Sequence, residues 1–131
     1  FILLKYMNIN DVFEYSSTLS QASRTNILQQ FRSGNIKLLI CSDAMARGMD
    51  IDDVGTVINY DSPGYIKTYV HRAGRTARAG KSGNCYTILA TGEAPRFHKM
   101  RRKAEEPERV KPFTFDKSKM EEYIESYNDA L

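Results

Sequence analysis

Three short apolar runs, separated by helix-like stretches, limit most strongly what this chain can fold into. The runs are residues 38–41, 56–60 and 85–90, and each is short, continuous and apolar, as buried strands of a parallel sheet are. Ser20 can cap a helix that Gly34 closes, and residues 66–72 form a second helical pattern. This alternation predicts an α/β fold with a mainly parallel sheet that helices cover on both faces.

Further elements are expected on either side of these runs. Residues 1–7 are typical of the end of an amphipathic helix, 12–15 of a short strand, and 43–53 of a loop or short turn. Thr91 can cap a helix that runs through Phe97 to Lys103. The chain opens in helix-like sequence without an initiator methionine, which indicates a piece of a longer protein.

A last helix is expected after residue 117. Ser118 and Glu121 have the spacing of a capping box. An apolar stripe follows on one face, made of Met120, Tyr123, Ile124, Tyr127 and Leu131. We expect the stripe to pack on the domain, with docking on a partner as the alternative. Residues 1–103 are therefore predicted to be one domain, and residues 104–131 a linker and C-terminal helix.

Composition excludes several classes of protein. The 131 residues are 41% apolar and 27% charged, which is typical of one globular domain, and no apolar run is long enough to span a membrane, so no membrane partner is expected. Cys41 and Cys85 are expected to be small core residues of strands, which favours a reducing, intracellular compartment. With no CxxC motif and only two histidines, no metal site is predicted.

Charge is distributed unevenly along the chain. Residues 71–111 hold eleven Lys and Arg against four Asp and Glu, whereas residues 1–70 hold six against seven and residues 112–131 two against five. A basic middle region indicates a polyanionic partner, or else a solvated helix face, and charge alone does not separate the two.

The segment GRTARAGKSG, residues 74–83, is similar to a phosphate-binding loop at first sight. That loop has four residues between its two glycines, whereas five separate Gly74 from Gly80 here. It also needs a strand before it and a helix after it, so that the helix N-terminus faces the anion. Here a helical pattern precedes the glycines and a strand follows them, which argues against a phosphate-binding loop.

Arginines recur at every third position in this segment. Arg72, Arg75 and Arg78 would line one flank of a tight helical turn. Guanidinium groups arranged in this way suit the charge of a phosphoryl group in transfer, as an arginine finger does. A helix end that carries surface charges is the alternative, and the arginines alone do not decide.

The loop after residues 38–41 adds groups that are typical of nucleotide or phosphate contacts. Ser42 places a hydroxyl at the carboxyl end of a strand, where ligands of parallel sheets bind. Gly48 permits close approach, and the carboxylate of Asp50 could accept a hydrogen bond from a ribose hydroxyl.

Taken together, four segments resemble the second RecA-like domain of DEAD-box RNA helicases, within helicase superfamily 2. They are SQASRTNILQQF (residues 20–31), SDAMARGMDI (42–51), VINYDSP (57–63) and YVHRAGRTARAG (69–80). The resemblance runs from about residue 15 to residue 90. Ser42 stands where threonine is commoner and Met49 where leucine is, and both substitutions are conservative.

This resemblance implies a RecA-like three-layer domain that lacks its N-terminal strand. It also implies a site for ATP, with Mg²⁺, that is formed mainly by a sister domain absent from this chain, whose fragment alone is expected to be inactive. Arg75 and Arg78 would reach the γ-phosphate, and His71 with Arg72 would touch the sister domain. Gly48 and Asp50 would lie near the ribose. RNA phosphates would be held by Arg24 and Ser42, with Gln21 positioning that loop.

A narrower resemblance concerns residues 91–105, TGEAPRFHKMRRKAE. It is to the helicases that act on large-ribosomal-subunit precursors, which implies a nuclear, nucleolar location, a ribosomal RNA precursor as partner, and pre-ribosomal assembly factors nearby. Two rival classes are a non-catalytic scaffold module and a DNA helicase.

Two weaker features are left open. His98 with residues 99–103 forms either an RNA surface or a solvated helix face. The rings of Tyr60 and Tyr65 either stack on a base or pack in the core or a turn, and packing is the expected role.

Overall fold

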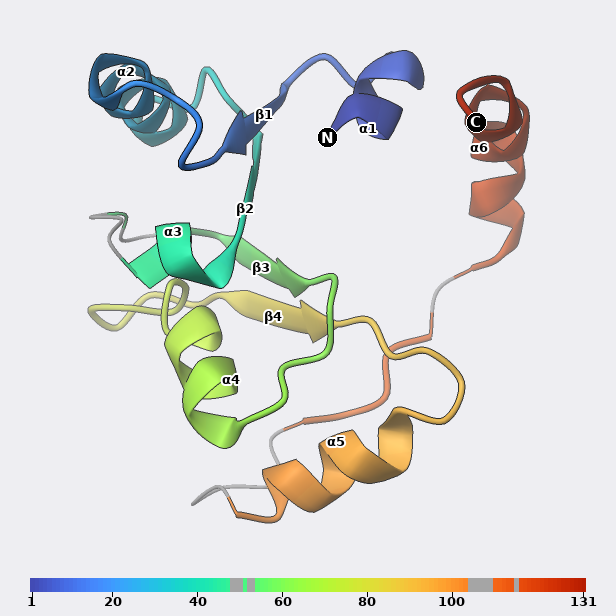
Figure 1. The fold of residues 1–131 in the computed structure, drawn as a ribbon. Coiled ribbons are helices and arrows are strands. Elements are labelled where there is room, and N and C mark those ends of the chain that lie inside the picture. Colours follow the sequence, from blue (N-terminus) through green and yellow to red (C-terminus); the bar gives the residue numbers. More distant parts are fainter. Residues whose placement is uncertain (48–50, 52–53, 104–109, 115) are drawn as a thin grey trace. The chain divides into compact units, whose positions relative to one another are not determined.

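The computed structural model covers residues 1–131 and describes residues 1–47, 51, 54–103, 110–114 and 116–131 (Figure 1). It divides into two compact units. Unit 1 comprises Phe1–Met49 and Phe113–Leu131, and unit 2 comprises Asp50–Pro112. Each unit is described by itself, and the predicted boundary between residues 103 and 104 stays a prediction.

Unit 1 is built on two parallel strands that a helix connects. Its elements are α1 (Ile2–Tyr6), β1 (Val12–Tyr15), α2 (Gln21–Arg32), β2 (Leu38–Cys41), α3 (Asp43–Arg47) and α6 (Ser118–Asp129). β1 and β2 pair in parallel from Val12 opposite Leu38 to Tyr15 opposite Cys41. Val12, Tyr15 and Ile36 are buried and form the small core of this unit.

Helix α2 begins and ends where the sequence predicts. The Ser20 side chain accepts a hydrogen bond from the backbone N–H of Ser23 at 3.1 Å, as an N-cap does. Gly34 has a φ of +78°, a left-handed conformation that glycine adopts without steric cost. The chain then returns along β2. The backbone N–H of Leu38, the first residue of β2, donates to Asp11 O just before β1.

Unit 2 repeats the strand–helix–strand order. Its elements are β3 (Thr56–Asn59), α4 (Ile66–Ala73), β4 (Asn84–Thr87) and α5 (Ala94–Arg101), and β3 pairs with β4 in parallel (Figure 1). Ile51, Phe97 and Met100 are its buried apolar side chains. The rings of Tyr69 on α4 and Phe97 on α5 meet edge to face, with centroids 5.8 Å apart, so α5 packs on α4.

The predicted α/β class with parallel strands is confirmed, whereas several local predictions are wrong. Residues 43–47 form the helix α3 and not a loop, while the rest of the predicted loop lies almost entirely outside the described residues. The strands β2 and β3 were expected to be buried, but Leu38, Cys41 and Ile58 are exposed. Each described sheet has two strands only, so each strand pairs on one side.

Exposure also corrects the expectation for the two cysteines. Cys41 is exposed at the end of β2, and Cys85 in β4 is half-buried. Neither is therefore a fully buried core residue. The strand predicted over 85–90 is β4, and it ends at Thr87.

The caps of α5 and α6 differ from their predictions. Helix α5 begins at Ala94, after Glu93, whose Oε2 accepts from the backbone N–H of Ala90 at 2.7 Å, so Thr91 is not its cap. Before α6, Asp116 Oδ1 accepts from both the N–H and the hydroxyl of Ser118. Helix α6 begins at Ser118 itself, after the N-cap residue Lys117, and has no side-chain capping hydrogen bond, so Ser118 makes no capping box with Glu121.

The apolar stripe of α6 is exposed and does not pack as expected. Its five side chains are 42% to 82% accessible to solvent: Met120, Tyr123, Ile124, Tyr127 and Leu131.

Among the described residues, none of the helices combines the length and the apolar character that a membrane crossing requires.

Candidate functional site

A buried asparagine organises the carboxyl ends of β3 and β4. Asn59, the last residue of β3, is 2% exposed. Its Nδ2 donates to Thr87 Oγ1 at 3.0 Å and, at 3.6 Å, to Cys85 Sγ, both on β4. A buried amide must be satisfied in this way, because an unpaired one costs free energy. Asn59 therefore ties the two strands together beside the start of the next loop.

Arg72 of α4 is fixed on this asparagine. Its Nη1 donates to Asn59 Oδ1 at 3.2 Å and to the carbonyl oxygen of Asp61 at 2.8 Å. One guanidinium thus links α4 to the end of β3 and to the loop that follows it. These contacts lie within unit 2, so Arg72 helps to hold α4 against the end of β3 and the loop after it.

Burial raises the pKa of the Cys85 thiol in the same network. The hydrogen bond from Asn59 and the charge of Arg72 lower that pKa by less than burial raises it. The thiol is therefore protonated at neutral pH. A reactive cysteine needs a thiolate, so Cys85 has a structural role.

The chain leaves α4 through a tight turn. The N–H of Arg75 donates to Arg72 O and that of Thr76 to Ala73 O, both at 3.1 Å, which is the spacing of a 3₁₀ turn. Thr76 is 5% exposed, and its hydroxyl donates to Gly55 O at 3.2 Å. The turn is therefore attached to the chain that leads into β3.

Gly83 lets a second segment pass close to this turn. A Cβ at position 83 would lie 2.7 Å from the backbone nitrogen of Ala77 and would also collide with the Thr76 side chain. Only glycine fits here without movement of the backbone. The sequence analysis did not single out Gly83, because a glycine before a strand is also common in an ordinary turn.

Arg75 is paired with His71 on the preceding turn of α4. Arg75 Nη2 and His71 Nε2 are 2.8 Å apart. A guanidinium has no acceptor, so Nε2 of His71 accepts and the ring proton lies on Nδ1. The imidazole therefore orients the arginine side chain.

Arg78 is bound to the end of the same helix. Its Nε donates to the carbonyl oxygen of Gly74, where the partial negative charge of the helix end favours a cation. Ala77 and Ala79, on either side, have φ values of +56° and +52°. Such values are uncommon for alanine, so the backbone bends sharply on both sides of Arg78.

The three arginines therefore do not line one helical flank, as the sequence analysis expected. The helix ends at Ala73, the tight turn ends at Thr76, and the positive φ of Ala77 changes the direction of the chain. The three arginines lie in one segment, but each donates a hydrogen bond to a different part of unit 2. The order of elements around this segment, helix before and strand after, is confirmed.

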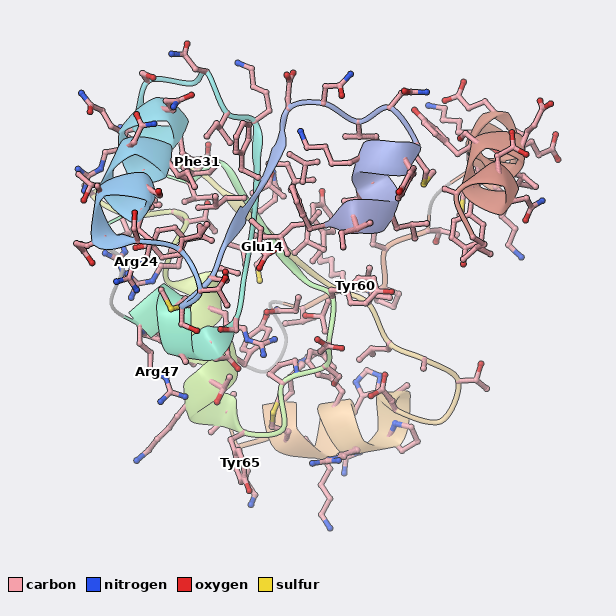
Figure 2. All side chains as sticks on the ribbon, turned by 45° about the horizontal axis from the view of Figure 1, so that its top comes forward. Glu14, Arg24, Phe31, Arg47, Tyr60 and Tyr65 are labelled. Atoms are coloured by element: carbon pink, nitrogen blue, oxygen red, sulfur yellow. The ribbon has the colours of Figure 1, made fainter. Side chains whose placement is uncertain are left out.

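The predicted RNA-binding residues lie in unit 1. Arg24 lies on the first turn of α2 (Figure 2), and its Nη2 donates to Gln21 Oε1 at 2.7 Å. Ser42 is exposed directly after β2, and its carbonyl oxygen accepts from Ala46 N–H as α3 begins. Gln21 and Arg24 are thus paired. Gly48 and Asp50 lie outside the described residues.

Metal binding has no candidate in the part of the chain that the structure describes. There, no group of three or more His, Cys, Asp or Glu side chains is arranged to hold an ion.

Comparison with known proteins assigns the chain to a family. Residues 2–80, which contain every predicted site residue, match the helicase conserved C-terminal domain. The chain is 42% identical over 131 residues to the human ATP-dependent RNA helicase DDX51, and it covers 20% of that protein. It spans about a fifth of the length of the curated relatives it matches.

Solved structures agree with this assignment. The Escherichia coli DEAD-box protein SrmB, solved bound to the regulator of ribonuclease activity A, is 35% identical with a TM-score of 0.69, over 79% of this chain and 59% of that one. Domain 2 of the DEAD-box helicase Mss116p, solved bound to an RNA duplex, is 26% identical with a TM-score of 0.72, over 96% of this chain and 50% of that one. The chain therefore belongs to the helicase conserved C-terminal domain family, and it is the C-terminal RecA-like domain of a DEAD-box helicase.

Proposed function

We propose that this chain belongs to the C-terminal half of an ATP-dependent RNA helicase and that it completes an ATP site formed mainly by another domain. The observation that carries the proposal is the turn after α4, in which His71 holds Arg75 and the helix end holds Arg78. A guanidinium held in advance stabilises developing phosphoryl charge without reorganising during the reaction. Arg75 and Arg78 then act on the γ-phosphate from across the domain interface.

The residues present fit ATP, with Mg²⁺ held by the other domain. Arginine binds phosphate oxygens through a planar set of donors and keeps its charge at every relevant pH. Bound Mg²⁺ would neutralise phosphate charge during transfer. The resemblance to DEAD-box helicases is what places that ion on the first RecA-like domain in this proposal. Gly48 and Asp50 are proposed to lie beside the ribose.

RNA is proposed as the other ligand, bound across both domains. Gln21 orients Arg24 through their 2.7 Å hydrogen bond, and Ser42 offers a hydroxyl at a strand end. Contacts of this kind go to phosphates, so binding is expected to be largely independent of sequence. Closure on ATP and RNA would remodel an RNA or an RNA–protein complex.

We assign this helicase to ribosome biogenesis in the nucleolus, with a ribosomal RNA precursor and pre-ribosomal assembly factors as partners. The support is the resemblance of residues 91–105 to helicases of that pathway. Human DDX51 matches along 100% of this chain and Schizosaccharomyces pombe dbp6 along 89%, so both matches include this region.

ATPase activity of the full-length protein tests the proposal. Turnover is expected to rise at least tenfold with saturating single-stranded RNA, and much less with DNA of the same sequence. No ATPase activity under either condition would leave the protein a scaffold module. Equal stimulation by DNA would make it a DNA helicase.

A further inference from the structure

A basic cavity lies at the end of α4 opposite to the arginine turn. It is an open depression of about 620 Å³ on the surface of unit 2. Three short segments of unit 2 form it: the turn before α4, the first residues of α4, and one side of α5. The described lining residues are Gly64, Tyr65, Ile66, Lys67, Thr68, Arg96, Lys99, Met100 and Lys103.

Four of these residues are cationic, and no described lining residue is acidic. Lys67 comes from α4, while Arg96, Lys99 and Lys103 come from α5 and the turn after it. The Arg96 guanidinium reaches back over the turn, to 3.3 Å from where a Cβ on Gly64 would stand. Like charges gathered around one concave surface repel each other and raise the local concentration of anions.

The start of α4 adds to the attraction for anions. Tyr65 is its N-cap residue and makes no side-chain capping hydrogen bond. N–H groups of the first helical turn have no partner within a helix, and they favour negative charge nearby. They reinforce the four side chains.

The exposed ring of Tyr65 favours single-stranded nucleic acid over an acidic peptide as the anion that binds here. Its side chain is 76% exposed (Figure 2), so the packing role expected from the sequence is wrong; Tyr60, at 79%, is corrected likewise. Single-stranded nucleic acid pairs an aromatic ring that stacks on a base with cations that hold phosphates. An acidic peptide would match the charges but would leave the exposed ring without a partner.

We propose that this cavity is an additional single-stranded RNA site, in which Tyr65 stacks on an unpaired base while Lys67, Arg96, Lys99 and Lys103 hold the flanking phosphates. It rests on RNA being the ligand of the proposed function. Its lining residues belong to unit 2, whereas Gln21, Arg24 and Ser42 belong to unit 1.

Paired charge reversals in the full-length protein test the cavity. Lys99→Glu/Lys103→Glu changes two lining residues, and Arg102→Glu/Lys111→Glu changes two exposed residues absent from the described lining, with the same change in net charge. Affinity is measured by fluorescence anisotropy with a labelled oligouridylate over a salt series. We expect the lining pair to weaken binding at least tenfold and to reduce the salt slope by about 1.4, since each phosphate contact on a single strand contributes about 0.7. The matched pair should weaken binding less than about threefold.

Tyr65 is tested separately from the charges. Tyr65→Ala should weaken oligouridylate binding by about fivefold or more, because stacking on one base contributes about 1–3 kcal/mol, whereas Tyr65→Phe should stay within about twofold of the wild type. Melting temperatures within about 2 °C of the wild type confirm folding. If Tyr65→Ala fails this check, the charge pairs and Tyr65→Phe decide.

The outcomes separate this inference from the proposed function. If the wild type binds no oligouridylate, both are wrong. If it binds and the two charge pairs weaken binding equally, or neither does, only the cavity proposal is wrong. An oligoglutamate of equal charge that displaces the RNA more effectively than unlabelled oligouridylate would show a peptide site and would also overturn it.

Discussion

The two ends of helix α4 are both basic, but they hold their charges in different ways. At the C-terminal end, Arg72 is bound to Asn59 and Asp61, Arg75 to His71, and Arg78 to Gly74. At the N-terminal end, Lys67, Lys99 and Lys103 are exposed side chains around an open cavity. Stabilising a transition state requires charges fixed in advance, whereas contacts with a polyanion tolerate mobile ones. The structure thus separates a site suited to chemistry from a surface suited to binding.

The largest expected effect is at the fixed end. Arg75→Ala in the full-length protein should lower the kcat of RNA-stimulated ATP hydrolysis by about 10³-fold, the lower part of the range for an arginine finger, and should change ATP affinity little. Arg102 is also basic but lies in the turn after α5. Arg102→Ala is therefore the matched control and should change kcat less than twofold. Equal losses in both would remove the distinction between the two ends.

Asn59 is predicted to hold the fixed end together. Asn59→Ala leaves the half-buried hydroxyl of Thr87 and guanidinium of Arg72 without this partner, and should lower the free energy of unfolding by about 2 kcal/mol. Asn84→Ala, an exposed residue at the start of β4, should change it by less than about 0.5 kcal/mol. Urea unfolding followed by circular dichroism measures both, and indistinguishable midpoints would contradict the role of Asn59.

Gly83 offers a sharper comparison of backbone contacts. Gly83→Ala should destabilise the protein by about 1–3 kcal/mol, because the added Cβ collides with the turn at Thr76 and Ala77. At Gly55, no atom lies within 4 Å of an added Cβ, so Gly55→Ala should be nearly neutral. Melting temperatures of the two variants give the answer, and a larger loss for Gly55→Ala would show that the approach to the turn is not close.

The smallest effect is on the pH dependence of stability. Burial raises the pKa of Cys85 above its ordinary value of 9.0, so the unfolded thiol loses its proton at lower pH than the folded one. The stability from this group is complete below pH 9.0 and is lost as pH rises through the folded pKa. Cys85→Ser should therefore flatten the decline in unfolding free energy above pH 9, and an unchanged slope would contradict it. Part of the decline should remain, because burial also raises the pKa of Tyr69.

The sequence predicted the elements better than it predicted their surroundings. Helix α2 could be read from Ser20 and Gly34 because a cap and a left-handed glycine are local features. The exposure of Cys41 and Tyr65 could not, since exposure depends on which segments pack nearby. At α6, the capping-box pattern placed the N-cap at Ser118, but the helix begins at that residue and Lys117 precedes it as the N-cap residue.

The candidate site was predicted in composition but not in geometry. The regular spacing of Arg72, Arg75 and Arg78 indicated a common flank, but the positive φ of Ala77 breaks the helical path. Asn59 was missed, although an amide inside an apolar strand is a usable signal, because a buried polar side chain needs partners on a neighbouring strand. The ATP and RNA roles of the named residues stay predictions.

Affinity for a mimic of the phosphoryl transition state tests the central claim most directly. In the presence of RNA, ADP with aluminium fluoride should bind the full-length wild type far more tightly than it binds Arg75→Ala, by a factor close to the loss in kcat, while ADP alone binds both equally. Equal affinity of the two proteins for ADP with aluminium fluoride would show that Arg75 does not act on the transferred phosphate, and the account of the turn after α4 would be wrong.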